Sequence, residues 1–410
     1  MSAQFRIICP TYWYPGSATD MRAIYVHDIT RHLVQRGHRV CVVTPAGTGA
    51  PLRDTLDGVE IHRFPLAVPE DLAYGKVAQS KVGLVSRMVR MQVMVQYLWR
   101  QYRAMLDCAR DFKPDVVHGH WAIPTGPALV YGSQKLRIPS VITMHGGDVY
   151  VNKAEGYDFP TRPYVKPVLH WTLTRASALT AISDDCVHHA LRAGASMEKI
   201  HLIMNGADLR RFSPSGETPD RPYGNKMVFA CRQLFPRKGI RYLIQAVARL
   251  RPQHPDIRLV LAGDGFERAE LEALADKLGV GDITTFLGWV VNSDLPKYFR
   301  ACAVSVIPSL EEGFGIPAAE AMGCEVPVVA TDAGGLPEVV ANGETGFVVP
   351  KADANALAEA IGKLLTDSAL AHRMGKAGRQ RALERFDWMR SAERFEELYT
   401  SLLSPAGVAS

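Results

Sequence analysis

Residues 304–323 read VSVIPSLEEGFGIPAAEAMG. The first four residues form a short apolar run that predicts a buried strand, and a turn bracketed by Gly313 and Gly315 follows it. Pro317 suits the start of a helix, because its fixed backbone angle fits the first turn, and Gly323 suits the end. A buried strand that passes directly into a helix is the repeating unit of an α/β fold.

The same alternation of apolar runs and helical patterns continues along the whole chain. Runs that are apolar almost throughout indicate parallel strands covered by helices on both faces. Two series of such runs predict two doubly wound domains, with a polar, proline-rich linker at 210–226. The expected strands are Phe5–Cys9, Arg39–Thr44, Val59–Phe64, Asp115–His118, Ser140–Met144, Leu179–Ile182 and His201–Met204, then Met227–Cys231, Arg258–Ala262, Thr284–Leu287, Val304–Ile307, Pro327–Ala330 and Gly346–Val349.

Length and composition are those of an ordinary globular protein. The 410 residues exceed one typical core, and 47% hydrophobic with 22% charged residues is a common balance. No stretch approaches the ~20 apolar residues of a membrane helix, and the N-terminus lacks the regions of a signal peptide. The seven cysteines form no Cys-x-x-Cys pair. We therefore expect buried free thiols in a reducing cytoplasm rather than disulfides or zinc.

Charge is distributed unevenly. The chain up to Phe212 holds 25 Lys and Arg against 17 Asp and Glu, and the rest holds 22 against 25, giving +8 and −3. A basic first part suits an anionic partner such as a membrane surface, although a solvated basic face explains it equally well. The basic residues are dispersed and lack interleaved aromatics, which argues against nucleic acid.

One helical pattern, at residues 84–105, carries an apolar stripe at spacings of three and four, with arginines around it. We expect this stripe to pack into the core; the alternative is a surface that meets anionic lipid. The stripe consists of Leu84, Met88, Met91, Val95, Leu98, Tyr102 and Met105, and the arginines are Arg87, Arg90, Arg100 and Arg103.

Ligands of open α/β sheets bind at the carboxyl ends of strands, so residues placed there are the candidates. Arg232 follows an expected strand and Lys238 precedes the next helix, and two fixed cations at such a point suit a diphosphate. In the opening stretch, Glu312 lies in the turn and Glu320 lies within the helix. The turn offers free backbone N–H groups at a helix N-terminus, which suit hydroxyl or phosphate oxygens.

The two glutamates admit three interpretations at this point. A carboxylate pair beside a flexible backbone can be the acid and the nucleophile of a glycosidase. The pair can instead hold a ligand, or Glu320 can interact with the helix dipole while Glu312 is solvated.

At the ends of two other strands, His145 and Asp148 lie among glycines and His120 follows His118. Each of these histidines can equally be a structural hydrogen-bonding residue.

Three common signatures are missing. There is no Asp-x-Asp tripeptide, the usual carboxylate pair that holds a metal on a nucleotide sugar. Gly263 and Gly265 are followed by Arg268 where a dinucleotide fingerprint requires a third glycine, and no Gly-Lys-Ser/Thr occurs. These absences argue against a dinucleotide dehydrogenase and against a P-loop enzyme.

Taken together, these stretches resemble the family 4 retaining glycosyltransferases, which have the GT-B fold: α/β, with two doubly wound Rossmann-like domains facing across a cleft. The most specific part is the Glu-x7-Glu signature formed by Glu312 and Glu320. The patterns YVHDITRHL and HGHWAIPTG resemble the branch that builds cell-surface polysaccharides. The resemblance covers nearly the whole chain, at 36–45, 114–121, 143–148, 178–183, 204–214, 231–239, 261–268, 286–290, 312–340 and 343–350.

The resemblance implies transfer of a sugar from a nucleotide-diphosphate sugar to an acceptor hydroxyl. It implies retention of the anomeric configuration, no metal or other cofactor, and a sugar or lipid-linked acceptor in polysaccharide or glycolipid synthesis. The acceptor domain is expected at 1–212 and the donor domain at 213–387, with a helix in 388–410 packing back on the first. The expected location is the cytoplasm, with peripheral contact at the inner face of an anionic membrane.

The resemblance also implies a role for individual residues along one nucleotide sugar. Those roles are diphosphate binding by Arg232 and Lys238, sugar binding by Glu312 and the backbone of Phe314, Gly315 and Ile316, ribose binding by Glu320, contact with the base by Val290, and catalysis beside the reacting sugar by His145 and Glu312.

The acceptor or phosphate loop is the part that departs from the family. Most relatives carry a Gly-Gly loop after the first strand, whereas residues 14–22 hold one glycine, Gly16. His120 and Asp148 are expected near the same loop. The acceptor is therefore expected to be unusual.

Three rival functions share part of the pattern. A glycoside hydrolase has no use for the diphosphate clamp of Arg232 and Lys238. A sugar-nucleotide epimerase shares the fold, but this sequence has the transferase's Glu-x7-Glu block and no clear epimerase pattern. A catalytically silent partner subunit would usually have lost one of the motif residues, and here all are present.

Overall fold

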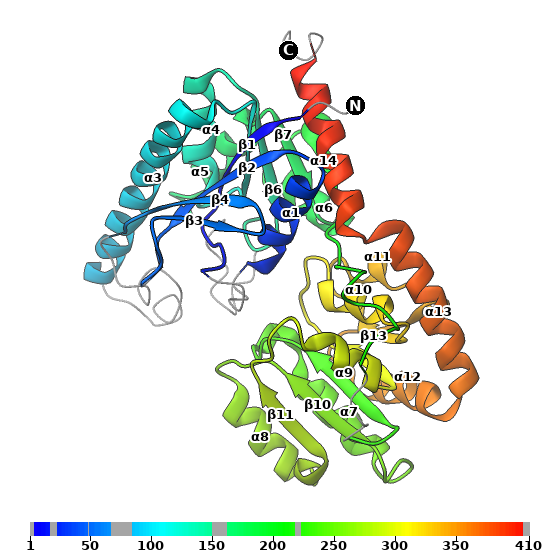
Figure 1. Cartoon of the computed structure of the whole chain (residues 1–410). Coiled ribbons are helices and arrows are strands. Elements are labelled where there is room, and N and C mark those ends of the chain that lie inside the picture. Colours follow the sequence, from blue (N-terminus) through cyan, green and yellow to red (C-terminus); the bar gives the residue numbers. More distant parts are fainter. Residues whose placement is uncertain are drawn as a thin grey trace. The chain divides into compact units, whose positions relative to one another are not determined.

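A computed structural model of the protein describes residues 4–16, 23–47, 49–66, 84–149, 162–217 and 223–404. The chain forms two compact units, Met1–Ile203 with Met389–Ser410, and Met204–Trp388 (Figure 1). Each unit is built on one largely parallel sheet. The expected fold class, α/β with two parallel-sheet domains, is confirmed.

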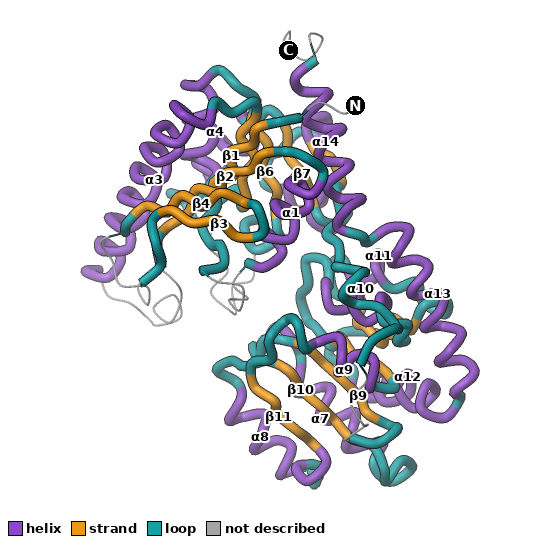
Figure 2. Tube along the Cα trace, viewed as in Figure 1, coloured by secondary structure: helices purple, strands orange, loops and turns teal. Residues whose placement is uncertain are grey.

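The first unit contains an eight-stranded sheet, whose strands are coloured orange in Figure 2. Its strands are β1 (Arg6–Pro10), β2 (Arg39–Pro45), β3 (Arg53–Leu56), β4 (Val59–Phe64), β5 (Val116–His120), β6 (Ser140–Met144), β7 (Ala178–Ala181) and β8 (Ile200–Leu202). Their order is β3-β4-β2-β1-β5-β6-β7-β8, and only β3 and β4 are antiparallel to each other. The sequence does not predict β3, because this edge strand reads RDTL and has no apolar run. Strand order reverses between β1 and β5, which is where ligands of such sheets bind.

Helices cover both faces of this sheet. They are α1 (Ile24–Gln35), α3 (Leu84–Phe112), α4 (Gly126–Leu136), α5 (Lys166–Arg175), α6 (Asp184–Arg192), the 3-10 turn η3 (Met197–Lys199) and α14 (Trp388–Leu403). On β5, Gly119 lies against Leu129 of α4, whereas His118 contacts Phe395 and Tyr399 of α14. Neighbouring residues of a strand point to opposite faces, so α4 and α14 lie on opposite sides of the sheet.

The second unit contains a six-stranded parallel sheet in the order β11-β10-β9-β12-β13-β14. Its strands are β9 (Met227–Cys231), β10 (Arg258–Ala262), β11 (Thr284–Gly288), β12 (Val304–Ile307), β13 (Val328–Thr331) and β14 (Gly346–Val349). Its helices are η4 (Pro236–Lys238), α7 (Ile240–Leu250), α8 (Arg268–Lys277), η5 (Gly281–Ile283), α9 (Leu295–Ala301), α10 (Ile316–Gly323), α11 (Leu336–Val339), α12 (Ala354–Thr366) and α13 (Ser368–Arg385). The apolar side chains of β9, β10, α7 and α12 share one buried core.

The boundary between the units lies earlier than the expected break after Phe212. Leu209 and Phe212 are buried, and the guanidinium of Arg379 on α13 donates to both of their carbonyl oxygens, at 3.1 and 2.9 Å. Residues 204–212 therefore pack as part of the second unit. At the other end, α14 joins the first unit from Met389 onward, and Arg36 of α1 pairs with its Glu396 at 2.6 Å.

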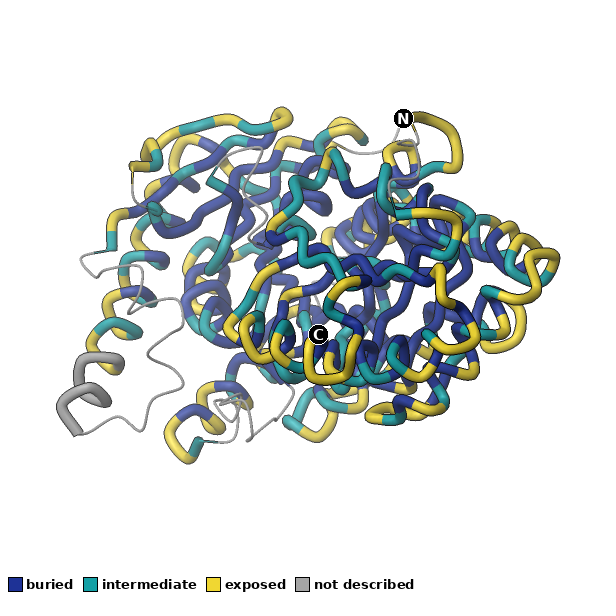
Figure 3. Tube along the Cα trace, turned by 90° about the horizontal axis from the view of Figure 1, so that it is seen from below, coloured by how far each residue is buried: buried dark blue, intermediate teal, exposed yellow. Residues whose placement is uncertain are grey.

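The stripe predicted on α3 is buried only in part. Met105 is fully buried, but Met91 and Val95 are 53% and 59% exposed, and Trp99 is 60% exposed. The expectation of a core-packed stripe is wrong for this described part of α3, which Figure 3 shows mainly in yellow and teal. The side chains of Leu84 and Met88 lie outside the described residues. None of the described helices has the length and hydropathy needed to span a membrane.

Candidate functional site

Three predicted residues meet at the carboxyl edge of the second sheet. Arg232 follows β9, Lys238 ends η4, and Glu312 follows β12, the neighbour of β9 in the sheet. The carboxyl ends of adjacent parallel strands open at the same edge, so the two loops lie side by side. The main chain joins them, because Leu310 N–H donates to the carbonyl oxygen of Arg237 at 2.7 Å.

Glu312 is at the centre of this cluster. Its Oε2 lies 3.1 Å from Nη1 of Arg232 and accepts a hydrogen bond of 2.9 Å from Nζ of Lys238. The same oxygen accepts a hydrogen bond of 3.1 Å from the hydroxyl of Ser309. The side chains of Arg232, Lys238 and Glu312 are 6%, 9% and 12% exposed. Two cations and one carboxylate thus leave a net positive charge in an environment that is largely shielded from solvent.

The pKa values in the cluster follow from burial and from charge. Burial raises the pKa of Glu312, but the charges of Arg232 and Lys238 outweigh it and hold the pKa at about 2. Burial lowers the pKa of Lys238 to about 8, against the attraction of Glu312. Glu312 is therefore ionised at neutral pH, which makes it unsuited to be the general acid of a glycosidase.

Arg232 keeps unused hydrogen-bonding capacity. Its Nε and Nη2 are buried, and neither has a hydrogen-bond partner within the described part of the chain. Leaving a buried donor without an acceptor costs about 1–3 kcal/mol. An anion whose oxygens reach these two nitrogens would remove that cost.

Two glycines allow the loops of this cluster to pack closely against each other. At Gly239 the backbone angle φ is +64°, and a Cβ would collide with the carbonyl oxygen of Pro308, directly after β12. At Gly263 φ is +134°, and a Cβ would collide with the carbonyl oxygen of Arg232. Only glycine suits either position. The glycine pair that is incomplete as a dinucleotide motif therefore begins with a residue that packs the β10 loop against Arg232.

In the last part of the turn before α10, the side chains pack inward and the main chain is the part left to contact a ligand. Gly315 precedes α10 with φ of +99°, and a Cβ there would collide with a methyl group of Leu336. The side chain of Phe314 is 2% exposed and packs edge-on against Phe386, with ring centres 5.5 Å apart. Ile316 begins the helix. The side chain of Phe314 is therefore not available to a ligand, and sugar binding by its backbone stays a prediction.

Glu320 and Val290 lie at the same edge of this sheet. Glu320 is 9% exposed on α10, and its charge adds to burial in raising the pKa of Cys231, the last residue of β9, to about 12. Glu320 is therefore close to the end of β9. Val290 is half-buried and follows β11, which is separated from β9 by β10.

In the first unit, histidines from two adjacent strands form a connected row. Nδ1 of His120 lies 2.9 Å from Nε2 of His145. Behind them, His118 bonds to the hydroxyl of Tyr399 through Nδ1, at 2.5 Å, and to the hydroxyl of Thr143 through Nε2, at 2.7 Å. The Nε2 of His120 and the Nδ1 of His145 are buried without a hydrogen-bond partner among the described residues.

Asp148 holds the end of this row in place. Its carboxylate accepts hydrogen bonds from the backbone N–H of His145, at 3.1 Å, and of Ala122, at 2.7 Å. Burial raises the pKa of Asp148 to about 6 and lowers the pKa of His145 to about 3. Burial, with the nearby histidines, also keeps the pKa of His120 well below its ordinary value. Both histidines are therefore neutral at pH 7.

Aromatic rings surround His145. Its ring centre lies 4.7 Å from that of Tyr25 on α1 and 5.3 Å from that of Trp121, which in turn contacts Trp13. The sequence does not predict the parts played by Tyr25 and Tyr399, because neither lies at the end of a strand. Trp121 could have been predicted from the sequence as a site residue, since it follows His120 directly after β5.

Comparisons with known proteins agree with this geometry. Residues 23–206 match the family described as Glycosyl transferase 4-like domain, and residues 217–381 match Glycosyl transferases group 1. A D-inositol 3-phosphate glycosyltransferase of Corynebacterium jeikeium is 30% identical over 409 residues, covering 96% of this chain and 94% of the relative. The chain belongs to the family 4 glycosyltransferases.

Solved structures share the whole fold of this glycosyltransferase. Sucrose-phosphate synthase from Thermosynechococcus elongatus superposes with a TM-score of 0.75 at 25% identity, over 97% of this chain and 99% of that one. Anabaena HepE in complex with UDP-glucose has a TM-score of 0.73 at 22% identity, over 97% and 100% of the two chains. Similar structures of this kind are GT-B glycosyltransferases, so the expected GT-B fold is confirmed.

Several of the predicted site residues of this glycosyltransferase form two clusters, one in each unit. Arg232, Lys238 and Glu312 are in direct contact, and so are His120 and His145. Gly16 is half-buried in the loop after β1. The rest of the unusual loop, residues 17–22, lies outside the described residues.

Proposed function

We propose that this glycosyltransferase moves a sugar from a nucleoside-diphosphate sugar to an acceptor hydroxyl, retaining the anomeric configuration and using no metal ion. The observation that carries the proposal is the pair of buried, unpartnered guanidinium nitrogens of Arg232 beside the ammonium of Lys238. A diphosphate offers closely spaced charged oxygens to both cations. The similarity to HepE, whose structure contains UDP-glucose, supports this class of donor.

Donor binding changes the partners of Glu312. In the structure its carboxylate lies against both cations. A diphosphate that pairs with Arg232 and Lys238 releases Glu312 to accept hydrogen bonds from the sugar hydroxyls. The backbone of Phe314, Gly315 and Ile316 lines the same sugar, Glu320 accepts from the ribose hydroxyls, and Val290 lies beside the base.

In the reaction, the bond between the anomeric carbon and the diphosphate oxygen breaks, and the acceptor oxygen bonds to the same face of that carbon. The acceptor proton passes to the departing phosphate oxygen. Negative charge grows on the diphosphate, where Arg232, Lys238 and the N-terminus of α10 stabilise it. These groups take the place of a divalent ion, whose usual Asp-x-Asp ligands are absent from the sequence.

His145 acts at the sugar end of the donor as a neutral group. Its pKa of about 3 keeps the ring uncharged, and its free Nδ1 can exchange a hydrogen bond with a sugar or acceptor hydroxyl. Asp148 fixes its backbone, and Tyr25 and Trp121 pack against its ring. A fixed, uncharged partner orients a hydroxyl without competing for the diphosphate.

The acceptor belongs to the first unit, and we infer a sugar or lipid-linked acceptor of polysaccharide or glycolipid synthesis. The exposed Met91, Val95 and Trp99 of α3 suit peripheral contact with an anionic membrane on its cytoplasmic side. The guanidinium of Arg103 lies 5.6 Å from the ring centre of Trp99, which adds a positive charge to this apolar surface.

A catalytically silent subunit or an epimerase would share the fold, so the test must detect transfer. Nucleotide sugars are screened by thermal shift, since a bound donor raises the melting temperature according to its affinity. The best donor is then offered with candidate acceptors, and the anomeric configuration of the product is determined by NMR.

The matched variants are Arg232→Ala and Arg241→Ala, the latter pairing with Glu267 on the same unit. We expect donor binding to be lost in the first and kept in the second. Equal donor affinity in the two variants would contradict the proposed diphosphate site, and release of free sugar or of an epimerised donor instead of transfer would contradict the proposed reaction.

A further inference from the structure

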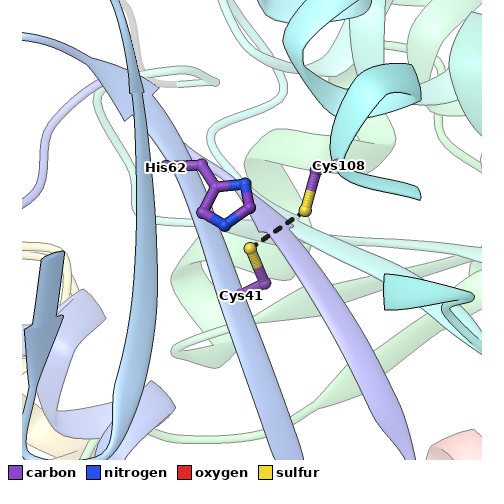
Figure 4. Close-up of side chains that lie close together, drawn as sticks. All are labelled: Cys41, His62 and Cys108. Carbon is purple, nitrogen blue, oxygen red and sulfur yellow. Dashed lines mark hydrogen bonds between the residues drawn. The ribbon is translucent and has the colours of Figure 1, made fainter. Parts of the chain in front are cut away.

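Three soft donor atoms converge in the first unit, outside the clusters described above. Cys41 lies on β2, His62 on β4 and Cys108 on α3, and Figure 4 shows their side chains pointing toward one another. Their ligand atoms all lie within 4.8 Å of one another, and the two sulfur atoms are 3.0 Å apart. Across the described ranges, no other group of three or more Cys, His, Asp or Glu side chains is arranged in this way.

Strand register brings these side chains to one face of the sheet. In the parallel pair β2 and β4, Cys41 is opposite Glu60 and Val43 is opposite His62. Side chains alternate along a strand, so Cys41 and His62 project from the same face, one step apart. Helix α3 packs on this face and supplies Cys108 from above it.

The environment of the sulfur atoms favours a metal ion over two isolated thiols. Cys41 and Cys108 are 0% and 2% exposed, and they are free cysteines. Two buried sulfur atoms and one imidazole are thus already close enough to share one ion. Thiolate sulfur and imidazole nitrogen are the ligands that zinc prefers.

We propose that Cys41, His62 and Cys108 bind one zinc ion, with a water molecule in the fourth position. The ion joins β2, β4 and α3 and so stabilises this side of the first unit. The sequence gives no hint of it, since the three ligands are far apart along the chain and lack the usual short Cys spacings.

Arg53 is the group that competes with the ion. It is opposite His62 in the β3–β4 pair, and its Nη1 contacts both ring nitrogens of His62. Arg53 is exposed, so its side chain can turn into solvent when zinc binds. Glu60, which pairs with Arg39 at 2.8 Å, is the acidic group on the same face and favours a cation there.

The experiment uses the full chain, reduced and stripped of metal, and titrated with zinc against a coloured chelator. We expect about one ion per chain and a higher melting temperature with zinc. Cobalt(II) in place of zinc should show the charge-transfer absorption of thiolate ligands. Cys108→Ser and His62→Ala should each weaken zinc binding by more than about tenfold, whereas Arg53→Ala should strengthen it.

The control is Cys302→Ser, a buried thiol of the second unit that donates to the carbonyl oxygen of Phe299. It should bind zinc like the wild type. His62 and Arg53 are not buried, so their variants report on the site even if Cys108→Ser does not fold. Equal zinc affinity in wild type and His62→Ala would overturn the proposal. So would a cobalt complex without thiolate absorption, or a Cys41–Cys108 disulfide in protein purified without air.

Discussion

The two clusters of this enzyme differ in how burial affects the charge of their residues. In the second unit, Arg232, Lys238 and Glu312 are buried together and keep their charges, because each carboxylate or cation has an opposite charge beside it. In the first unit, His120, His145 and Asp148 are buried without such partners, and burial pushes all three toward their neutral forms.

The difference shows how one kind of sheet edge can serve two tasks. A charged cluster with a spare cation suits the charged diphosphate of the proposed donor, whose departure it would stabilise. Two neutral histidines beside aromatic rings suit sugar hydroxyls, which need hydrogen bonds and a surface to pack on. The predictions below test this division, from the largest expected effect to the smallest.

Acid should unfold the first unit before the second. His118 and His145 have pKa values of about 3, below the ordinary 6.5, so the stability they contribute is complete above pH 6.5 and is lost as the pH falls toward 3. Glu312, with a pKa of about 2, loses its contribution only below pH 4.5. We expect a loss of several kcal/mol in the first unit, measured by hydrogen exchange of peptides from each unit.

Asp148 has the opposite effect on the stability of the first unit in acid and reduces the expected loss. Its pKa of about 6 lies above the ordinary 3.8, so its protonation stabilises the first unit as the pH falls between these values. The destabilisation caused by protonating His118 and His145 should exceed this stabilisation, because two histidines act against one carboxyl group. Simultaneous loss of protection in both units would show that the two clusters do not differ in stability.

Glu312→Ala should lower kcat by about 10³-fold, because the sugar loses its main hydrogen-bond acceptor. The fold should be intact by circular dichroism recorded with the donor added, since the donor diphosphate then neutralises the two cations. Glu311→Ala, which changes the adjacent acid, is the control and should turn over normally. Turnover near the wild-type rate in Glu312→Ala would remove Glu312 from the site.

His145→Asn should lower kcat by about 10²-fold and leave donor affinity unchanged. The reason is that His145 is neutral and, in the proposed function, acts at the sugar end of the donor rather than at the diphosphate. His201→Asn, at a half-buried histidine of β8, is the matched control. A large loss of donor affinity in His145→Asn would contradict the division of tasks between the clusters.

Donor affinity should fall by up to about tenfold per pH unit above pH 8. The pKa of Lys238 is about 8, lower than ordinary because of burial, and only its protonated form attracts a diphosphate. Titration calorimetry across this range measures the effect. A constant affinity would show that Lys238 does not carry the diphosphate.

Chelators should leave the transfer rate unchanged at moderate temperature, because in the proposed reaction cations of the chain take the place of a metal at the diphosphate. If the zinc site is occupied, the melting temperature should fall in the same samples while the rate does not. A rate that disappears with chelator and returns with magnesium or manganese would contradict metal-free transfer.

Much of the second cluster could be predicted from the sequence. Strand ends are readable as apolar runs, so Arg232 and Glu312 could be placed at the ends of expected strands, and β9 and β12 are neighbours in the sheet. The exposed half of α3 could not be predicted, because a stripe of this kind has the same spacing whether it meets a core or solvent. The edge strand β3 was missed for the opposite reason, since a strand at an edge needs no apolar run.

The sequence by itself determined the α/β architecture, the family and the residues that gather at each sheet edge, because local periodicity and short motifs encode them. The tertiary structure decided how those residues behave. It brought Glu312 between two cations, joined His118 to Tyr399 across 281 positions, and set two distant cysteines beside a histidine. Charge state depends on burial and on partners from other strands, and neither is written in the order of residues along the chain.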